Sequence, residues 1–364
     1  MAERLFVPAG DSLADRSVAP AGDSLADRSV ANGSGGLAGG MFVTWERHRR
    51  TRGLAAHFGL SLHEVEGQGP RFRRYWRQLA GTYGKLRSGA GTLIFVQNPS
   101  IVLTVFVLCW RALARKQCVV VMDAHNEAVV PEIFPWKVVR LVAAWAIRKA
   151  DFTIVTNDSL AQKVHALGGR PLVLPDSLPD VAPAPVRALG AAPVLRLLVI
   201  ATYASDEPIA EILEAARQLV GCAEFQFTGN FRKLDPAVVA AVSPNVTFLG
   251  FVTDEDYWER MRAVDAVVDL TLLDDCLVCG AYEAVALGRP LVLSDTRALR
   301  DYFRQGAVYC SKEPAAIVSA VRQLQADYAR LSEEVARLRP LLQAEWGGQA
   351  AAVVTELAGA RSAK

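Results

Sequence analysis

Apolar and polar residues alternate along this chain on two length scales from residue 41 onward. Short runs rich in Val, Ile, Leu and Phe are separated by longer segments whose apolar residues recur every three or four positions. The short runs predict buried strands, and the longer segments predict amphipathic helices. Because strands and helices that alternate in this way are typical of βαβ units, we expect parallel sheets with helices on their faces.

The predicted strands fall into two groups, separated by a segment rich in proline and alanine. In the first group they are expected at 41–45, 62–66, 92–96, 118–122, 152–156 and 171–174. In the second group they are expected at 195–201, 223–228, 246–251, 266–270 and 290–294. The main predicted helices are 135–149, 208–219, 254–264, 282–287, 314–325 and 328–357, with one more that begins near 99–100.

The proline-rich segment between the two groups indicates an interdomain linker. We therefore expect an α/β protein with two doubly wound, Rossmann-like domains at 41–180 and 193–340, joined by a linker at 181–192. A C-terminal helix and tail at 341–364 would follow. Two such domains would face a cleft, since ligands of doubly wound sheets bind outside the carboxyl ends of the strands.

The first 40 residues contain a perfect tandem duplication. The segments 8–19 and 20–31 both read PAGDSLADRSVA, and a glycine-rich stretch follows up to Met41. Two short units are too few to build a solenoid. We expect residues 1–40 to be a disordered leader and Met41 to be the functional start.

Composition and charge narrow the class of protein. With 364 residues, of which 51% are hydrophobic, the chain is typical of a packed globular protein and not of a disordered one. A formal net charge of +2 argues against a general nucleic-acid binder. The charge is uneven, however, because residues 41–180 carry +9 and residues 181–364 carry −5. This asymmetry indicates that the first half meets an anionic substrate or a membrane surface.

Targeting and metal signals are missing from the sequence. The amino terminus lacks the ordered regions of a signal peptide, and the apolar run at 101–110 is too short to span a bilayer. The CxxC pair Cys276 and Cys279 has no second pair to complete a zinc site, so we expect neither a metal nor another cofactor. These features predict a cytoplasmic protein, and a peripheral position at the inner face of the plasma membrane stays open.

The segment 272–293 holds the most informative chemistry. It reads LLDDCLVCGAYEAVALGRPLVL and places a polar loop between a strand and a helix that begins near Cys279 and Gly280. Gly280 lets backbone amides approach a ligand, and N–H groups at a helix start favour an anion such as a diphosphate. Asp275 on the loop and Glu283 about one turn inside the helix can point into one cleft. One carboxylate would then meet a sugar while the other holds a ribose.

Asp275 and Glu283 resemble the acid-x7-acid motif of glycosyltransferase family 4, and the following AVALGRP is similar to that family's usual sequel. The resemblance covers roughly residues 41–345. It implies the two-domain GT-B fold and a retaining, metal-independent transfer of a sugar from a nucleotide-sugar donor.

The resemblance also implies roles for individual residues. Glu283 would bind the nucleotide ribose, Asp275 would lie near the donor sugar, and the amides of Cys279, Gly280 and Ala281 would cradle the diphosphate. Asp275 stands where the family commonly has Glu, so the preferred sugar can differ. His125, which follows the strand at 118–122, is similar to the family's sugar-facing histidine and would contact a donor hydroxyl or the leaving phosphate.

The phosphate site departs from the family pattern. After the first strand of the second domain, Asp206 and Glu207 stand where the family usually has Arg and Lys. The next loop, at 228–233, supplies basic residues instead, which could stabilise a departing nucleoside diphosphate. We therefore place the donor site at four residues of that loop, Thr228, Gly229, Arg232 and Lys233.

The acceptor side is expected in the first domain. Its basic segments carry interleaved aromatic residues, which suits an anionic lipid headgroup or a polyprenyl diphosphate. The candidate residues are Arg47, Arg49, Arg50, Arg73 and Arg74. A saccharide or polyprenyl-linked acceptor and peripheral contact with an anionic membrane are the expected partners, and nucleic acid is not.

Three hypotheses follow from these residues. The first is a retaining glycosyltransferase in the assembly of a polysaccharide or glycolipid. The second is a non-catalytic GT-B protein that binds a nucleotide sugar or serves as a partner subunit, which the acids at Asp206 and Glu207 motivate. The third is a sugar-nucleotide epimerase of the same fold.

Overall fold

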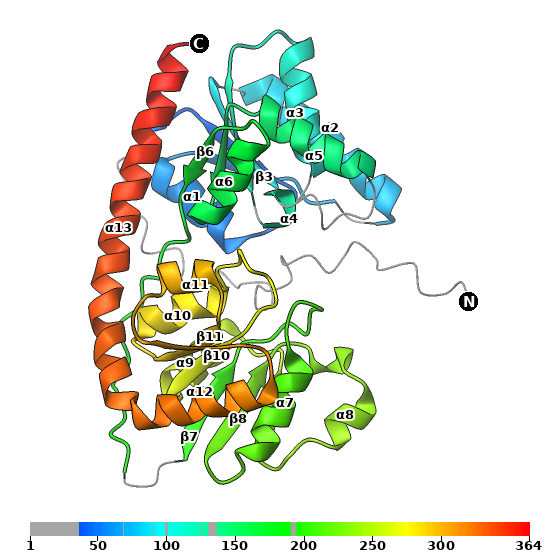
Figure 1. The fold of residues 1–364 in the computed structure, drawn as a ribbon. Helices are drawn as coiled ribbons and strands as arrows, with labels where there is room; N and C mark the ends of the chain where they lie inside the picture. The colour runs from blue at the N-terminus through cyan, green and yellow to red at the C-terminus, as the bar shows by residue number, and fades with distance from the viewer. Residues whose placement is uncertain are drawn as a thin grey trace. The chain divides into compact units, whose positions relative to one another are not determined.

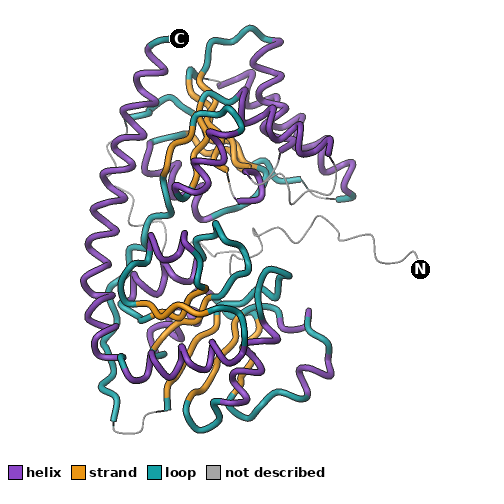
Figure 2. Tube along the Cα trace, in the orientation of Figure 1, coloured by secondary structure: helices purple, strands orange, loops and turns teal. Residues whose placement is uncertain are grey.

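The computed structural model describes residues 36–67, 69–89, 91–98, 101–124, 126–129, 137–190 and 194–364. Within this part the chain divides into two compact units (Figure 1). The N-terminal unit runs up to Ser177 and also takes in Glu345–Lys364, and the C-terminal unit is Leu178–Ala344. Both units consist of a parallel sheet with helices on its two faces (Figure 2).

The N-terminal unit has a six-stranded sheet in the order β2-β1-β3-β4-β5-β6, with every neighbouring pair parallel. Its strands are β1 (Met41–Thr44), β2 (Ser61–Glu64), β3 (Leu93–Asn98), β4 (Val119–Ala124), β5 (Phe152–Val155) and β6 (Pro171–Val173). Its helices are α1 (Arg49–Phe58), α2 (Arg71–Gly89), α3 (Ile101–Leu113), α4 (Asn126–Val129), α5 (Lys137–Lys149) and α6 (Asp158–Ala166).

Alternate side chains of these strands enter two separate cores. One core joins strand residues such as Val43, Val96 and Val120 to helices α2, α3, α5 and α6. The other joins the intervening residues, such as Phe42 and Phe95, to α1 and to the end of the last helix of the chain. This alternation follows from the two-residue period of a strand and produces the doubly covered sheet.

Residues 36–40, which were predicted to belong to a disordered leader, are folded. Residues 36–40 are part of the N-terminal unit, because Leu37 is fully buried in the core on the α1 side. The N–H of Ser61 also donates to the carbonyl of Gly40 over 3.0 Å, which extends the pairing of β1 with β2. The prediction of a leader up to residue 40 is therefore wrong for its last five residues, and the duplication lies outside the described residues.

The C-terminal unit has a second six-stranded parallel sheet, in the order β12-β11-β10-β7-β8-β9. Its strands are β7 (Leu195–Val199), β8 (Ala223–Thr228), β9 (Val246–Gly250), β10 (Ala266–Asp269), β11 (Leu291–Ser294) and β12 (Ala307–Cys310). Its helices are α7 (Ile209–Gln218), η4 (Phe231–Lys233), α8 (Pro236–Ala240), α9 (Asp254–Ala263), α10 (Cys279–Leu287), α11 (Arg297–Tyr302), α12 (Pro314–Ala326) and the first part of α13 (Tyr328–Ser362).

The segment predicted as a linker packs on the C-terminal unit over its described part. Leu178 and Val181 contact the core that α9, α10 and α11 build on one face of the sheet. The N–H of Ala184 donates to the carbonyl of Leu287 over 2.9 Å, and Arg339 donates to the carbonyl of Val181 over 2.9 Å. The prolines therefore keep this segment extended along the end of α10 and beside α13.

Helix α13 belongs to both units. Val335, Leu338 and Leu342 pack in a core of the C-terminal unit, whereas Val353 and Leu357 pack in a core of the N-terminal unit. Beyond the boundary at residue 344, the indole N–H of Trp346 donates to the carbonyl of Pro175 over 3.0 Å. No helix in the described ranges is both long enough and apolar enough to cross a bilayer.

Arg50 lies at the centre of a buried ion-pair network in the N-terminal unit. Its side chain is 4% exposed, and it donates to the Asp123 carboxylate at the end of β4 over 3.0 Å and to Asp176 over 2.5 Å. It also donates to the carbonyl of Leu174 over 2.9 Å. Although burial alone would lower the pKa of Arg50, the two carboxylates outweigh it and raise that pKa. Arg50 therefore ties α1 to the carboxyl ends of β4 and β6.

We expect Arg50→Met to lower the free energy of unfolding by about 3–5 kcal/mol, because Asp123 would be left as a buried charge without its main partner. Urea unfolding followed by circular dichroism measures this change. The matched control is Arg47→Met, since Arg47 pairs with Glu66 on the surface and such pairs contribute at most about 1 kcal/mol. Equal stability of the two variants would contradict the assignment.

Candidate donor site in the C-terminal unit

The order of the second sheet identifies where a ligand would bind. From the adjacent strands β7 and β10 the chain builds the sheet outward in opposite directions. In doubly wound sheets this point of reversal leaves a crevice outside the carboxyl ends of the two strands. The loop at 200–208 follows β7, and the loop at 270–278 follows β10 and leads into α10.

Gly280 fixes the start of α10 against both strands. Its N–H donates to the carboxylate of Asp269, the last residue of β10, over 2.9 Å. A Cβ at this position would lie 2.5 Å from Ile200 Cγ1 and 2.6 Å from Asp269 Oδ2, so no larger residue has room. The sequence predicted that Gly280 exposes its amide to a ligand, but the structure uses this amide for Asp269. The role of Gly280 in a diphosphate cradle stays a prediction, and in this structure its amide has a partner within the protein.

Glu283 lies on the second turn of α10 and is almost fully buried. The hydroxyl of Tyr257, which comes from α9, donates to Glu283 Oε2 over 2.5 Å. Tyr257 is itself 2% exposed, so this bond lies out of water. A carboxylate can accept several hydrogen bonds, and Tyr257 supplies one of them to Glu283.

The remaining predicted residues of this segment differ in their exposure. Asp275 is half-buried in a turn of the loop after β10, and Cys279 is exposed as the first residue of α10. Ala281 is fully buried, and its N–H donates to the carbonyl of Val278 over 3.3 Å. Of the three predicted cradle amides, those of Gly280 and Ala281 are thus engaged within the protein.

The loop after β7 holds its shape through its own acidic residues. The N–H groups of Thr202 and Tyr203 donate to Glu207 Oε2 over 2.9 Å and 2.8 Å, and the Thr202 hydroxyl donates to Glu207 Oε1 over 2.7 Å. The carbonyl of Asp206 accepts from the N–H of Leu272 over 2.7 Å. The two acids that replace the expected basic pair therefore shape this loop and connect it to the loop after β10.

The loop after β8 approaches the same place. Lys233 Nζ donates to the carbonyl of Thr202 over 3.1 Å, and Arg232 beside it is exposed. The Thr228 hydroxyl accepts from the N–H of Ala201 over 3.1 Å. Gly229 has a φ of 80° and a Cβ there would lie 2.0 Å from the carbonyl oxygen of Ala201. Lys233 thus reaches the loop after β7, while Thr228 and Gly229 hold the ends of β7 and β8 together.

The predicted residues of the first domain do not form one surface. Arg47 pairs with Glu66, Arg49 and Arg73 are exposed, and Arg74 lies 5.7 Å from the ring centre of Tyr75. Arg50 is buried in the network with Asp123, so the prediction that it faces an acceptor or a membrane is wrong. His125 lies outside the described residues.

Sequence reasoning missed three residues that shape the site. Tyr257 was not separated from the other aromatic residues of its helix, since only the packing of α9 against α10 brings it to Glu283. Asp269 could have been suspected, because an acid at the end of an apolar strand needs a buried partner. Glu207 was interpreted only as the replacement of an expected basic side chain, and its hydrogen bonds within the loop were not foreseen. Within the described ranges, no group of three or more His, Cys, Asp or Glu side chains is placed to hold a metal ion.

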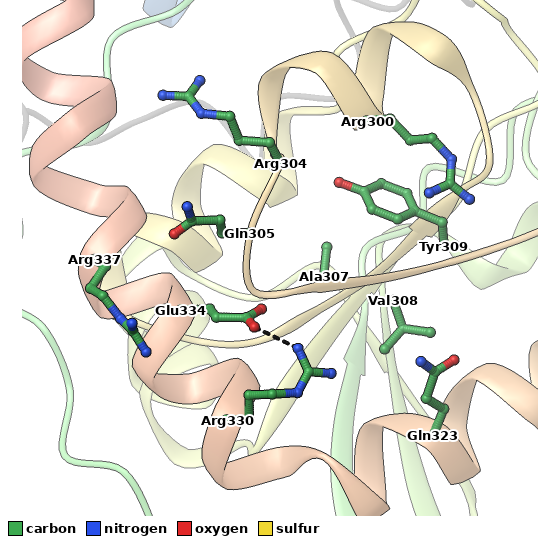
Figure 3. Close-up of a pocket in the computed structure, with 10 residues that line it drawn as sticks. All are labelled: Arg300, Arg304, Gln305, Ala307, Val308, Tyr309, Gln323, Arg330, Glu334 and Arg337. Carbon is green, nitrogen blue, oxygen red and sulfur yellow. Dashed lines mark hydrogen bonds and ion pairs between the residues drawn. The ribbon is translucent and has the colours of Figure 1, made fainter.

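A separate pocket of about 550 Å³ lies on the C-terminal unit and is open to solvent (Figure 3). Arginines from α11, α13 and the segment after α11 surround it, together with Tyr309 of β12. Arg330 pairs with Glu334 over 2.5 Å, and Arg300 pairs with Asp295 over 2.5 Å. None of the predicted site residues lines this pocket.

Solved structures similar to this chain share its fold at low sequence identity. Sucrose-phosphate synthase from Thermosynechococcus elongatus is 16% identical, with a TM-score of 0.66 over 83% of this chain and 84% of that one. HepE from Anabaena, in complex with UDP-glucose, is 13% identical, with a TM-score of 0.65 over 89% and 92%. The lipopolysaccharide outer core galactosyltransferase WaaB, in its apo form, is 14% identical, with a TM-score of 0.55 over 81% and 85%.

No curated protein matches the chain by sequence. The two parallel sheets with their flanking helices have the GT-B architecture of the similar glycosyltransferase structures. Residues 195–327, which span most of the C-terminal unit, match the family described as glycosyl transferases group 1. The predicted GT-B fold is thus confirmed, and the similarity to glycosyl transferases group 1 covers the C-terminal unit.

Proposed function

We propose that this protein is a retaining glycosyltransferase that takes its sugar from a nucleotide-sugar donor bound in the C-terminal unit. The observation that carries the proposal is the buried carboxylate of Glu283, held by Tyr257 beside the point where the strand order reverses. The match of this unit to glycosyl transferases group 1 supports it, as does the bound UDP-glucose of the similar HepE structure.

In this proposal Glu283 binds the ribose of the donor. A ribose presents two neighbouring hydroxyl donors, and an ionised carboxylate accepts bonds from both. Tyr257 fixes the carboxylate in one orientation, so that its remaining acceptor sites face the ligand. Asp275, on the loop before α10, meets the donor sugar, and His125 contacts a donor hydroxyl or the leaving phosphate.

The diphosphate relies on side-chain charge more than on backbone amides. The N–H groups of Thr202 and Tyr203 already donate to Glu207, and the N–H of Gly280 already donates to Asp269. Lys233 extends over the loop after β7, and Arg232 stands next to it. These two cations, together with the amino end of α10 at Cys279, would stabilise the negative charge of the departing nucleoside diphosphate.

The proposed transfer occurs on one face of the sugar. The bond between the anomeric carbon and the diphosphate oxygen breaks, and the acceptor oxygen bonds to that carbon on the same face. The proton of the acceptor hydroxyl passes to the leaving phosphate, so no protein base is required. Because Lys233 and Arg232 counter the charge of the leaving group, the proposal involves no metal ion.

The acceptor is proposed to be a saccharide or a polyprenyl-linked saccharide that reaches the site from the N-terminal unit. A role in polysaccharide or glycolipid assembly is supported by the fold likeness to WaaB, which is described as a lipopolysaccharide outer core galactosyltransferase. A cytoplasmic protein with peripheral membrane contact would suit that role.

A non-catalytic protein that binds a nucleotide sugar is the second candidate. It is favoured by the acids Asp206 and Glu207, which lie where a basic pair was expected and whose backbone and side-chain oxygens bond within the protein. Binding of nucleotide sugars with no release of nucleoside diphosphate, across a panel of sugars and extracted lipid acceptors, would favour this candidate.

Glu283→Gln is expected to reduce nucleoside diphosphate release from the preferred nucleotide sugar by on the order of 100-fold, because hydrogen bonds to a charged group contribute about 1.5–3 kcal/mol each. Glutamine keeps the shape of the side chain and an oxygen that can accept from Tyr257. The matched control is Glu214→Gln, since Glu214 lies on the exposed side of α7 and pairs with Arg217. Wild-type release by the Glu283 variant would rule out the ribose role.

Tyr257→Phe is expected to raise the KM for the donor about tenfold and to change kcat less than about twofold, because one hydrogen bond that orients Glu283 is lost while the ring packing stays. Steady-state kinetics measures both constants. Tyr309→Phe is the control, since Tyr309 lies on the edge strand β12 and donates to the carbonyl of Phe303. If both variants shift KM alike, Tyr257 does not act through Glu283.

Donor turnover is expected to persist in excess EDTA, since the proposal assigns the charge of the leaving group to Lys233 and Arg232. Release of nucleoside diphosphate is compared before and after chelation, and Lys233→Ala serves as the positive control for loss of charge stabilisation. Turnover that disappears with EDTA and returns with Mg²⁺ would overturn the metal-free mechanism.

A further inference from the structure

The solvent side of helices α2, α3 and α5 combines basic residues with exposed apolar side chains. The sequences of these three helices hold eleven lysines and arginines and no aspartate or glutamate. The exposed large apolar side chains of the described N-terminal unit all lie on the same three helices. These are Phe72, Trp76, Tyr83, Val102, Leu113, Val138 and Leu141.

The exposed aromatic residues of α2 form a single stripe along the helix. Phe72, Trp76 and Tyr83 are spaced four and seven positions apart, which places them on one face of a helix. Their exposed fractions are 76%, 61% and 49%. Arg73 and Arg77 follow the first two aromatic residues directly and are exposed as well. The outward face of α2 therefore alternates large rings with guanidinium groups.

This orientation of α2 is fixed by contacts on its inner side. The indole N–H of Trp45 donates to the Thr82 hydroxyl over 2.9 Å, and the Gln78 amide donates to the carbonyl of Trp45 over 3.4 Å. Tyr75 and Leu79 pack into the core on the same side. The inner side of α2 is thus occupied by both apolar and polar contacts, while Phe72, Trp76 and Tyr83 stay exposed at a cost in apolar surface left in water.

Helices α3 and α5 extend the same surface. They pack on the core that α2 also covers, and Figure 1 shows the three helices on one side of the N-terminal sheet. Val138 and Leu141, at the start of α5, are 70% and 67% exposed, and Arg140 lies between them in the sequence. The opposite side of the sheet, which α1 and α13 cover, carries acidic as well as basic side chains. They form ion pairs there, such as Arg52 with Glu64 and Arg170 with Glu356.

We propose that the face formed by α2, α3 and α5 docks on an anionic lipid bilayer, with Phe72, Trp76 and Leu141 inserted at the headgroup level. Aromatic rings suit this depth, and arginine stems reach phosphates while covering apolar surface. The absence of acids in these helices complements anionic lipids, whereas a second copy of the same face would bring like charges together. The inference extends the acceptor part of the proposed function and needs no assumption about the donor.

The test is co-sedimentation of the full chain with phosphatidylcholine vesicles, with and without about 30% phosphatidylglycerol, at two salt concentrations. We expect binding to the anionic vesicles only, weakened by salt. Arg73→Gln with Arg77→Gln should lower the affinity about 25-fold, because each cation near such a surface contributes about fivefold. Phe72→Ser with Trp76→Ser should lower it about tenfold or more at either salt concentration.

Matched controls distinguish vesicle binding by this surface from nonspecific adsorption of exposed apolar side chains. Val220→Ser with Val238→Ser removes exposed apolar side chains from the C-terminal unit and should leave vesicle binding unchanged. Circular dichroism and the thermal midpoint confirm that each variant folds. Donor hydrolysis without lipid acceptor should be equal in the Phe72/Trp76 variant and the wild type, so a failed membrane proposal does not imply a failed donor site.

Several outcomes would overturn the proposal. Equal binding to neutral and anionic vesicles would contradict docking on an anionic bilayer. Equal binding by the Phe72/Trp76 variant and the control variant would show that this face does not bind the membrane. A dimer in light scattering that dissociates in the Phe72/Trp76 variant would show that a second copy covers it instead.

Discussion

The close approach of Gly280 to Asp269 and Ile200 is the contact on which the proposed donor site depends. Asp269 ends β10, Ile200 follows β7, and these two strands are adjacent in the sheet. Helix α10 can begin against them only because Gly280 has no Cβ. The start of α10 then sets the rotation of the helix. Glu283, one turn further on, is thereby turned toward α9 and reaches Tyr257. A shift of α10 by one residue would remove the carboxylate from this position.

The hydrogen bonds that the loop amides already make decide how an anion could be held. In this unit the loop amides nearest the strand ends are satisfied by carboxylates of the chain itself, Glu207 and Asp269. A buried N–H without a partner is costly, so a protein that folds before its ligand arrives gains stability by pairing these groups. In the proposed mechanism the charge of the diphosphate is therefore met by long, exposed side chains. Lys233, which lies across the Thr202 carbonyl, is placed to do so.

Much of the fold could be predicted from the sequence because its strands are short apolar runs. The strand at 223–228 was predicted with its observed bounds, and α10 was expected near the Cys279 at which it begins. The strand β12 was missed, because Ala307–Cys310 is brief and only half-buried on one side. The acids of the motif were found by their spacing, but their partners were not, since the contact of Tyr257 with Glu283 joins two helices whose packing no local pattern encodes.

Arg50 and Arg73 show why the basic half of the chain could not be assigned from sequence alone. Both lie in runs of arginine with aromatic neighbours, and both were placed on the same acceptor surface. The topology separates them, because α1 follows β1 and carries Arg50 over the ends of β4 and β6, where it pairs with Asp123 and Asp176. Arg73 lies on α2, whose inner side is already occupied by Tyr75, Leu79 and Thr82. The charge of Arg50 is therefore used inside the fold, whereas the charge of Arg73 stays at the surface beside the exposed rings of Phe72 and Trp76.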